Sequence, residues 1–111
     1  MQGPEPLELS VDHVGASTVV GVAGEIDLAT APQFEAFLRD QLAHTHAVFM
    51  LDLSGVNYLG SAGLDVLLRV RAECDRRGVD LVFGECSFIV RRVFEVSGLT
   101  GYFLRGESAT G

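Results

Sequence analysis

The chain contains no lysine, and all eight of its basic side chains are arginine. Aspartate and glutamate together number 15, which gives a formal net charge of -7. A nucleic-acid-binding protein needs a basic surface to contact phosphates, and an anionic membrane surface attracts basic segments for the same reason. The charge balance therefore argues against direct binding to nucleic acid and against a membrane surface as the partner.

Long apolar runs and targeting signals are missing as well. No stretch reaches the roughly 20 apolar residues that a membrane-spanning helix requires. The first residues, MQGPEPL, have neither the basic start nor the apolar run of a secretory signal, and Gln2 occupies the position where myristoylation needs glycine. We therefore expect a cytoplasmic protein.

Cysteine is scarce. Cys74 and Cys86 have neither the spacing of a metal site nor that of a disulfide framework. A chain of 111 residues that is 48% hydrophobic buries enough surface to fold without such cross-links. We expect reduced thiols, no bound metal and no cofactor, in a single domain over residues 1–111. Its ordered core should run from about residue 7 to 104, with short flexible termini.

Hydrophobic periodicity predicts an α/β fold. Strands are expected at 7–14, 18–24, 47–53 and 79–83, and helices at 31–43, 61–77 and 87–97, with a short final strand at 102–105. The first two strands should form a hairpin. The run at 47–53 is almost entirely apolar, which predicts a strand covered on both faces. Alternating elements predict a mixed, mostly parallel sheet of four to five strands with about three to four helices packed on it.

The helix ends are marked by small polar residues and glycines. Ser87 is expected to cap the third helix, and Gly78 and Gly98 follow the second and third helices at the position where a left-handed residue is favoured. Residues 25–30, EIDLAT, are expected to form a loop that leads into the first helix.

Ser61 lies in the segment NYLGSAGL, residues 57–64, where a strand is expected to turn into a helix. A nucleophilic serine in G-x-S-x-G would need glycine two positions earlier, where Leu59 stands. No motif places His13, His44 or His46 beside it as a base. Hydrolytic chemistry is therefore not supported.

Three other interpretations of this segment stay open. The backbone around Gly60 and Gly63 could cradle a phosphate at the helix start, although the common nucleotide-binding pattern needs a lysine. Ser61 could be the N-cap of the helix. Its hydroxyl could also be the target of a modifying partner, because Gly60 and Ala62 leave it accessible.

Three segments in order resemble the STAS-domain anti-sigma factor antagonists. Residues 51–68, LDLSGVNYLGSAGLDVLL, resemble the pattern D-L-S-x-V-x-[FY]-[LM]-[DG]-S-[ST]-G-L followed by an apolar helix. Residues 24–30, GEIDLAT, and 81–100, LVFGECSFIVRRVFEVSGLT, resemble the family's other two patterns. The resemblance covers about residues 7–104 and implies the STAS fold.

The resemblance implies a bacterial regulator of transcription and stress response without enzymatic activity. In that family the antagonist binds an anti-sigma factor that is also a serine kinase of the GHKL type, and binding releases the sigma factor. The kinase then phosphorylates the serine, and a PP2C-type phosphatase reverses this. Carried over to this chain, the phosphorylated residue is Ser61. The partner-binding residues are Asp27, Thr30, Gly60, Ser61, Ala62 and Gly63.

The chain departs from the family pattern at two positions. Gly60 stands where many members have aspartate, and Ala62 stands where many have a second hydroxyl residue.

Other interpretations of the chain stay open. Asp27 could bond the local backbone at the helix entry and not contact a partner, and Thr30 fits a helix cap. Two other functions stay open: a STAS subunit of a lipid-transport or stress-signalling assembly, and a small nucleotide-binding sensor.

Overall fold

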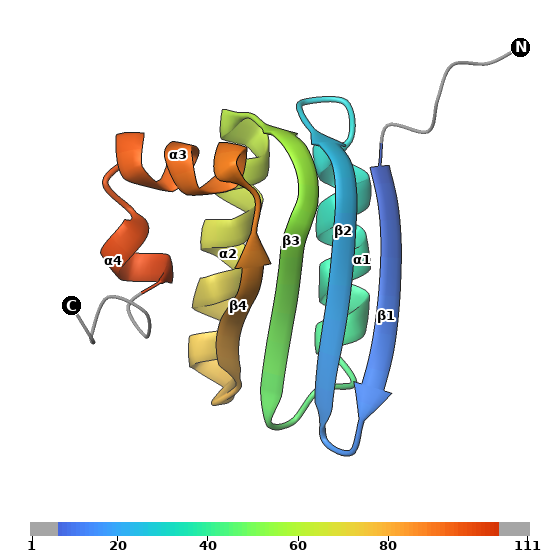
Figure 1. Cartoon of the computed structure of the whole chain (residues 1–111). Coiled ribbons are helices and arrows are strands. Elements are labelled where there is room, and N and C mark those ends of the chain that lie inside the picture. The colour runs from blue at the N-terminus through green and yellow to red at the C-terminus, as the bar shows by residue number, and fades with distance from the viewer. Residues whose placement is uncertain (1–6, 105–111) are drawn as a thin grey trace, which may run out of the picture.

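The computed structural model describes residues 7–104, which form one four-stranded sheet and, outside it, four helices (Figure 1). The elements, in chain order, are β1 (Leu7–Val14), β2 (Ser17–Ile26), α1 (Ala31–Leu42), β3 (Val48–Leu59), α2 (Ser61–Arg77), β4 (Asp80–Cys86), α3 (Phe88–Val96) and α4 (Thr100–Phe103).

The strands lie in the sheet in chain order, β1-β2-β3-β4. β1 and β2 pair antiparallel through a tight turn in which Gly15 has a φ of 61°. β2 with β3, and β3 with β4, pair parallel, because α1 and α2 return the chain to the same end of the sheet. The predicted hairpin and the mixed, mostly parallel sheet are confirmed.

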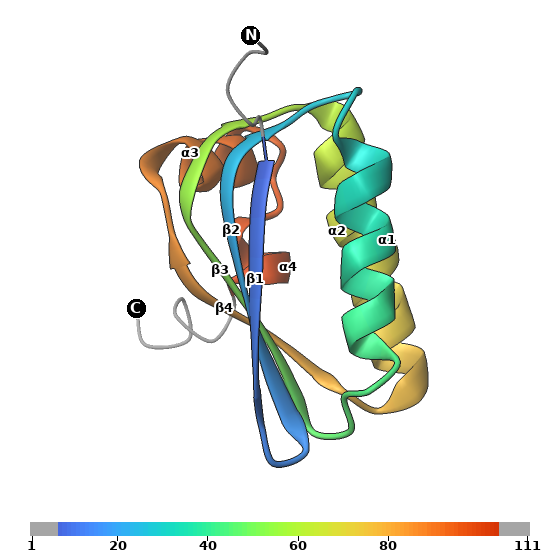
Figure 2. The ribbon, with the colours of Figure 1, turned by 90° about the vertical axis from the view of Figure 1, so that its right-hand side faces the viewer.

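α1 and α2 pack side by side on one face of the sheet (Figure 2). Strand residues that point to this face are buried, such as Phe49, Leu51 and Leu53 in β3, whereas the intervening Met50 and Asp52 are partly exposed. The prediction that this strand is covered on both faces was therefore wrong. An apolar run can also arise in a strand whose open face carries a few apolar residues.

β3 is longer than expected, since it continues to Leu59. The segment after Leu53 has the small, polar composition of a turn, but it forms an irregularity within the strand. Asp52 Oδ1 accepts a hydrogen bond from the Ser54 backbone at 2.9 Å, and the register with β2 shifts between Gly21 and Ala23. Such a bulge bends a strand without ending it, so Gly60 alone separates β3 from α2.

Most predicted helix ends are confirmed. The Ser87 hydroxyl accepts a hydrogen bond from the Val90 backbone at 3.3 Å, and Gly78 and Gly98 adopt φ values of 72° and 75° just after α2 and α3. β2 extends to Ile26, so the loop before α1 is shorter than expected.

The predicted final strand was wrong, because residues 100–103 form the short helix α4. The Phe103 ring lies 4.8 Å from that of Phe94 and 5.2 Å from that of Phe83, between centroids. This aromatic cluster packs α4 against Phe94 of α3 and Phe83 of β4. The chain therefore turns into a helix below α3 and does not add a strand to the sheet (Figure 1). Residue 105, the last of that predicted strand, and both predicted flexible termini lie outside the described residues.

Neither a membrane span nor a metal cluster is found within residues 7–104. No helix there is long and apolar enough to cross a membrane, and no group of three or more His, Cys, Asp or Glu side chains could hold a metal ion. Cys74 is buried in the core, and its burial raises the pKa of the thiol to about 11. It therefore stays protonated at neutral pH.

Arg71 holds α4 against α2, which the sequence analysis did not foresee. Its side chain is only 7% exposed. Its guanidinium donates a hydrogen bond to the Tyr102 carbonyl at 2.8 Å, lies 4.5 Å from the Tyr102 ring centroid, and is 3.6 Å from Asp75 Oδ1. The charge is thus satisfied although it is buried.

We expect Arg71→Ala to lower the free energy of unfolding by about 2 kcal/mol, because it removes a charged hydrogen bond, a cation–π contact and buried aliphatic stem. Urea denaturation measures this loss. The matched control is Arg76→Ala, at a side chain that is 69% exposed and pairs with Glu73, for which we expect a change within about 0.5 kcal/mol. Equal losses for both variants would contradict the role of Arg71.

Candidate protein-binding site

The loop after β2 and the start of α2 lie side by side at the carboxyl end of the parallel strands. Ile26 and Leu59, the last residues of β2 and β3, are register partners. The Gly60 backbone donates a hydrogen bond to the Ile26 carbonyl at 2.9 Å. Segments more than thirty residues apart in sequence therefore lie side by side. Of the predicted partner-binding positions, Asp27, Gly60, Ser61 and Ala62 are at least partly exposed there, whereas Thr30 and Gly63 are buried and cannot contact a partner through their side chains.

Ser61 is the first residue of α2, and its side chain is exposed. Gly60, in an extended conformation with φ -92° and ψ 179°, occupies the N-cap position, and no side-chain capping bond is formed. The interpretation of Ser61 as the helix N-cap was therefore wrong. Because its hydroxyl does not hold the helix end, it is available to another molecule.

Asp27 and Thr30 organise the loop between β2 and α1. Asp27 Oδ1 accepts hydrogen bonds from the backbones of Ala29 and Thr30, both at 3.0 Å. The buried Thr30 hydroxyl accepts from the Asp27 backbone at 2.9 Å and donates to the Glu25 carbonyl at 2.8 Å. The bonds to Thr30 hold the pKa of the Asp27 carboxyl below its usual range, so a fixed negative charge lies in this loop at neutral pH.

Gly63 is buried and sets the distance between α2 and the sheet. A Cβ atom placed there would lie 2.4 Å from Ile26 Cγ2 and 2.8 Å from Leu59 Cδ1. Only glycine allows this approach without displacing the Ile26 and Leu59 side chains. The neighbouring Ala62 is half-buried and borders a cavity beside the site.

Two large apolar side chains are exposed around this surface. Leu28, at the loop after β2, is 82% exposed, and Tyr58, at the end of β3, is 50% exposed. The Tyr58 ring lies over Gly60, since a Cβ atom there would be 3.2 Å from Tyr58 Cε2. Both side chains can supply apolar contact area to a partner that docks beside Ser61. Sequence reasoning missed both residues, because their exposure depends on the tertiary arrangement.

A cavity of about 270 Å³ separates the first turns of α1 and α2. Leu28 and Ala62, both next to the start of α1 or α2, contribute to its lining. The lining residues are Leu28, Ala31, Pro32, Glu35, Ala62, Asp65, Val66 and Arg69.

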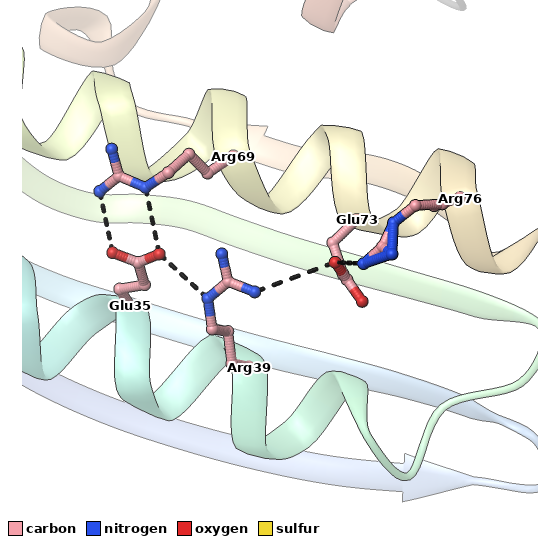
Figure 3. A network of polar contacts seen from close by, with 5 residues as sticks. All are labelled: Glu35, Arg39, Arg69, Glu73 and Arg76. Carbon is pink, nitrogen blue, oxygen red and sulfur yellow. Dashed lines mark hydrogen bonds and ion pairs between the residues drawn. The ribbon is translucent and has the colours of Figure 1, made fainter.

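A network of ion pairs joins α1 to α2 next to this cavity (Figure 3). Arg69 makes two hydrogen bonds to Glu35, from Nη2 at 2.8 Å and from Nε at 3.2 Å, and Arg39 Nε donates to the same carboxylate at 3.0 Å. Arg39 also approaches Glu73, which pairs with Arg76. The bond from Arg69, more than that from Arg39, lowers the pKa of Glu35.

The histidines do not contribute to the site. His13 lies on β1 near the hairpin turn, and its ring is 3.3 Å from the Thr18 hydroxyl. His44 and His46 follow α1 at that same end of the molecule, whereas α2 begins at the opposite end (Figure 1). The structure thus gives Ser61 no histidine base.

Comparisons with known proteins identify the family to which this α/β domain belongs. A family model described as "Mlab, STAS domain" matches residues 9–106, so the chain belongs to the STAS domain family. The resemblance of residues 51–68 to this family is confirmed.

Several similar proteins are anti-sigma factor antagonists. The anti-sigma-F factor antagonist RsfB of Mycobacterium tuberculosis is 33% identical over 93% of this chain and 84% of that protein. The anti-sigma-B factor antagonist of Listeria monocytogenes is 33% identical over 86% of this chain and 81% of that protein. The crystal structure of an anti-sigma factor antagonist from Mycobacterium paratuberculosis has a TM-score of 0.73 at 30% identity, covering 93% of this chain and 87% of that chain.

We expect Gly63→Ala to lower the free energy of unfolding by about 1–2 kcal/mol. Overpacking against Ile26 and Leu59 costs about 1–3 kcal/mol, and the higher helix propensity of alanine offsets up to about 1 kcal/mol of it. Thermal or urea denaturation measures the change. The control is Gly101→Ala in α4, where a Cβ atom would meet nothing within 4 Å. A Gly63→Ala variant as stable as this control would contradict the close approach.

The pH dependence of stability tests the Glu35 network. The folded-state pKa of Glu35 is lowered from 4.5. The stabilisation that the ionised carboxylate gives to the folded state is therefore complete above pH 4.5, and it is lost as pH falls through the folded-state pKa. We expect wild type to be more stable than Glu35→Gln at pH 7, with a difference that disappears in acid. Asp40→Asn, on the same helix, is the control and should not reproduce this loss. A difference that persists unchanged in acid would contradict the network.

Proposed function

We propose that this protein is an anti-sigma factor antagonist. It binds an anti-sigma factor at the surface formed by Asp27, Leu28, Tyr58 and the start of α2, and phosphorylation of Ser61 ends that binding. Family membership and the named relatives favour this function. The observation that carries the proposal is the exposed Ser61 hydroxyl at the first position of α2, free of any capping bond.

The surface has the composition that a protein partner requires. Leu28 and Tyr58 supply apolar contact area. Hydrogen bonds of Asp27 and Thr30 fix the backbone of the loop between β2 and α1, which carries Leu28. A preorganised loop loses little conformational entropy on binding. Gly60 and Ala62 flank the serine without bulky side chains, so a partner can approach the hydroxyl closely.

Phosphorylation at this position would change binding more than folding. A phosphate adds about -1.5 to -2 charges at pH 7, and the positive end of a helix accommodates it. In a docked interface the same group must be desolvated next to Asp27. A loss of about 3 kcal/mol would weaken binding more than a hundredfold. The modification can therefore separate the complex while the domain stays folded.

The partner under this proposal is an anti-sigma factor that is also a GHKL-type serine kinase, and a PP2C-type phosphatase resets the protein in the cytoplasm. Ala62 leaves Ser61 as the single serine or threonine in this turn. The nucleotide-sensor alternative gains no support, because Gly63 packs against Ile26 and Leu59 and leaves no open glycine cradle.

A pull-down from native lysate, with retained proteins identified by mass spectrometry, tests the proposal. We expect wild type and Ser61→Ala to retain a GHKL-type kinase and Ser61→Glu to lose it, because the added carboxylate imitates part of the phosphate charge. Only wild type should then accept phosphate from that kinase.

The matched control is Ser97→Glu, which adds the same charge at an exposed serine after α3. It should retain the kinase. A kinase held equally by the Ser61→Glu and wild-type baits would refute Ser61 as the switch. Phosphate incorporated into Ser61→Ala would show that another residue is the acceptor.

A further inference from the structure

Charged side chains are divided unequally between the helices and the sheet. Within residues 7–104, every arginine lies on α1, α2 or α3, and no arginine lies on a strand. The strands carry carboxylates instead: Glu8, Asp12, Glu25, Asp52, Asp80 and Glu85. The negative net charge is therefore concentrated on the sheet.

Glu8, Asp12, Asp52 and Asp80 belong to the sheet face that α1 and α2 leave open. Glu8 and Asp12 are exposed on β1 and alternate with inward residues, and the partly exposed Asp52 occupies the same face of β3. Val19 and Met50 are register partners on this face and are partly exposed. Figure 2 shows the two long helices on the other side of the sheet only.

A groove of about 350 Å³ crosses this open face from β1 to β3. Register places Glu8 beside Ala23, which pairs with Gly55, and places Ser10 beside Gly21, which pairs with Asp52. The floor is low because its residues are small: a Cβ atom at Gly55 would lie 2.7 Å from that of Ala23. The Ser10 hydroxyl covers Gly21, since a Cβ atom at Gly21 would lie 2.7 Å from Ser10 Oγ. The open part of the floor is therefore Ala23 and Gly55, with Glu8 on one side and Asp52 on the other.

We propose that this groove docks a basic segment of a protein partner. One arginine or lysine side chain of that segment lies across the floor, with its aliphatic stem on Ala23 and Gly55. Its cationic group lies between Glu8 and Asp52, which accept charge-assisted hydrogen bonds. This surface is separate from the Ser61 surface and does not rest on the function proposed for it.

Charge complementarity decides between this occupant and others. A second copy of the chain paired along β1 would bring Glu8 and Asp12 against the same acidic residues, which is unfavourable for directly opposed strands. Nucleic acid would be repelled for the same reason. A metal ion lacks the necessary group of ligands within the described residues.

The test uses a short synthetic peptide in which lysine alternates with threonine, titrated into the isotope-labelled full chain by NMR. We expect amide shifts to concentrate on β1, β2 and β3 around Gly21 and Gly55. Binding should weaken about fivefold in Glu8→Gln/Asp52→Asn, which removes two exposed ion pairs. It should also weaken as salt shortens the Debye length from about 8 Å.

The matched control is Asp40→Asn/Glu95→Gln, which removes the same two charges from exposed positions on α1 and α3. Its affinity should stay within about twofold of wild type, because long-range attraction is screened. Ser10→Arg offers a second variant, since it places a cation of the chain's own in the groove and should compete with the peptide.

Three outcomes would overturn the proposal. Equal weakening in the two double variants would mean that the peptide senses only net charge. Shifts confined to α1 and α2 would locate binding elsewhere. Dimerisation through β1 in sedimentation equilibrium would identify a second copy as the occupant.

Discussion

The missing side chain at Gly63 lets α2 begin directly against the ends of β2 and β3. The same approach allows the Gly60 backbone to bond Ile26, and this leaves Ser61 at the first helical position facing outward. The Asp27–Thr30 loop then lies next to the serine because its strand ends there. A modification at Ser61 is therefore close to the elements of the proposed binding surface.

Local patterns predicted most of the fold because they reflect short-range physics. Alternation, helical spacing and glycine stops depend on residues a few positions apart. The predictions that were wrong concerned segments whose structure depends on residues distant in the sequence. β3 continued through its turn-like segment because β2 still offered pairing groups up to Ile26, and the end of the chain became α4 because Phe103 found Phe83 and Phe94.

The sequence indicated where the candidate site lies but not its detailed geometry. The sequence pattern identified Ser61 and Asp27, yet it could not show that Gly60, not Ser61, caps α2, since that depends on backbone angles. The exposure of Tyr58 follows from strand register. Arg71 did carry a sequence signal, because it lies between Leu67 and Cys74 on the buried stripe of α2. Its partner Tyr102 lies 31 residues further on.

The central claim is that a phosphate on Ser61 separates a complex without disturbing the fold. The most direct measurement is calorimetric titration of the co-purified kinase partner, made catalytically inactive, into the unphosphorylated and the Ser61-phosphorylated protein, with the Tm of each form. The account predicts a Tm that is unchanged or higher after phosphorylation and an affinity at least a hundredfold weaker. Equal affinity of the two forms would contradict it, and so would loss of affinity accompanied by unfolding.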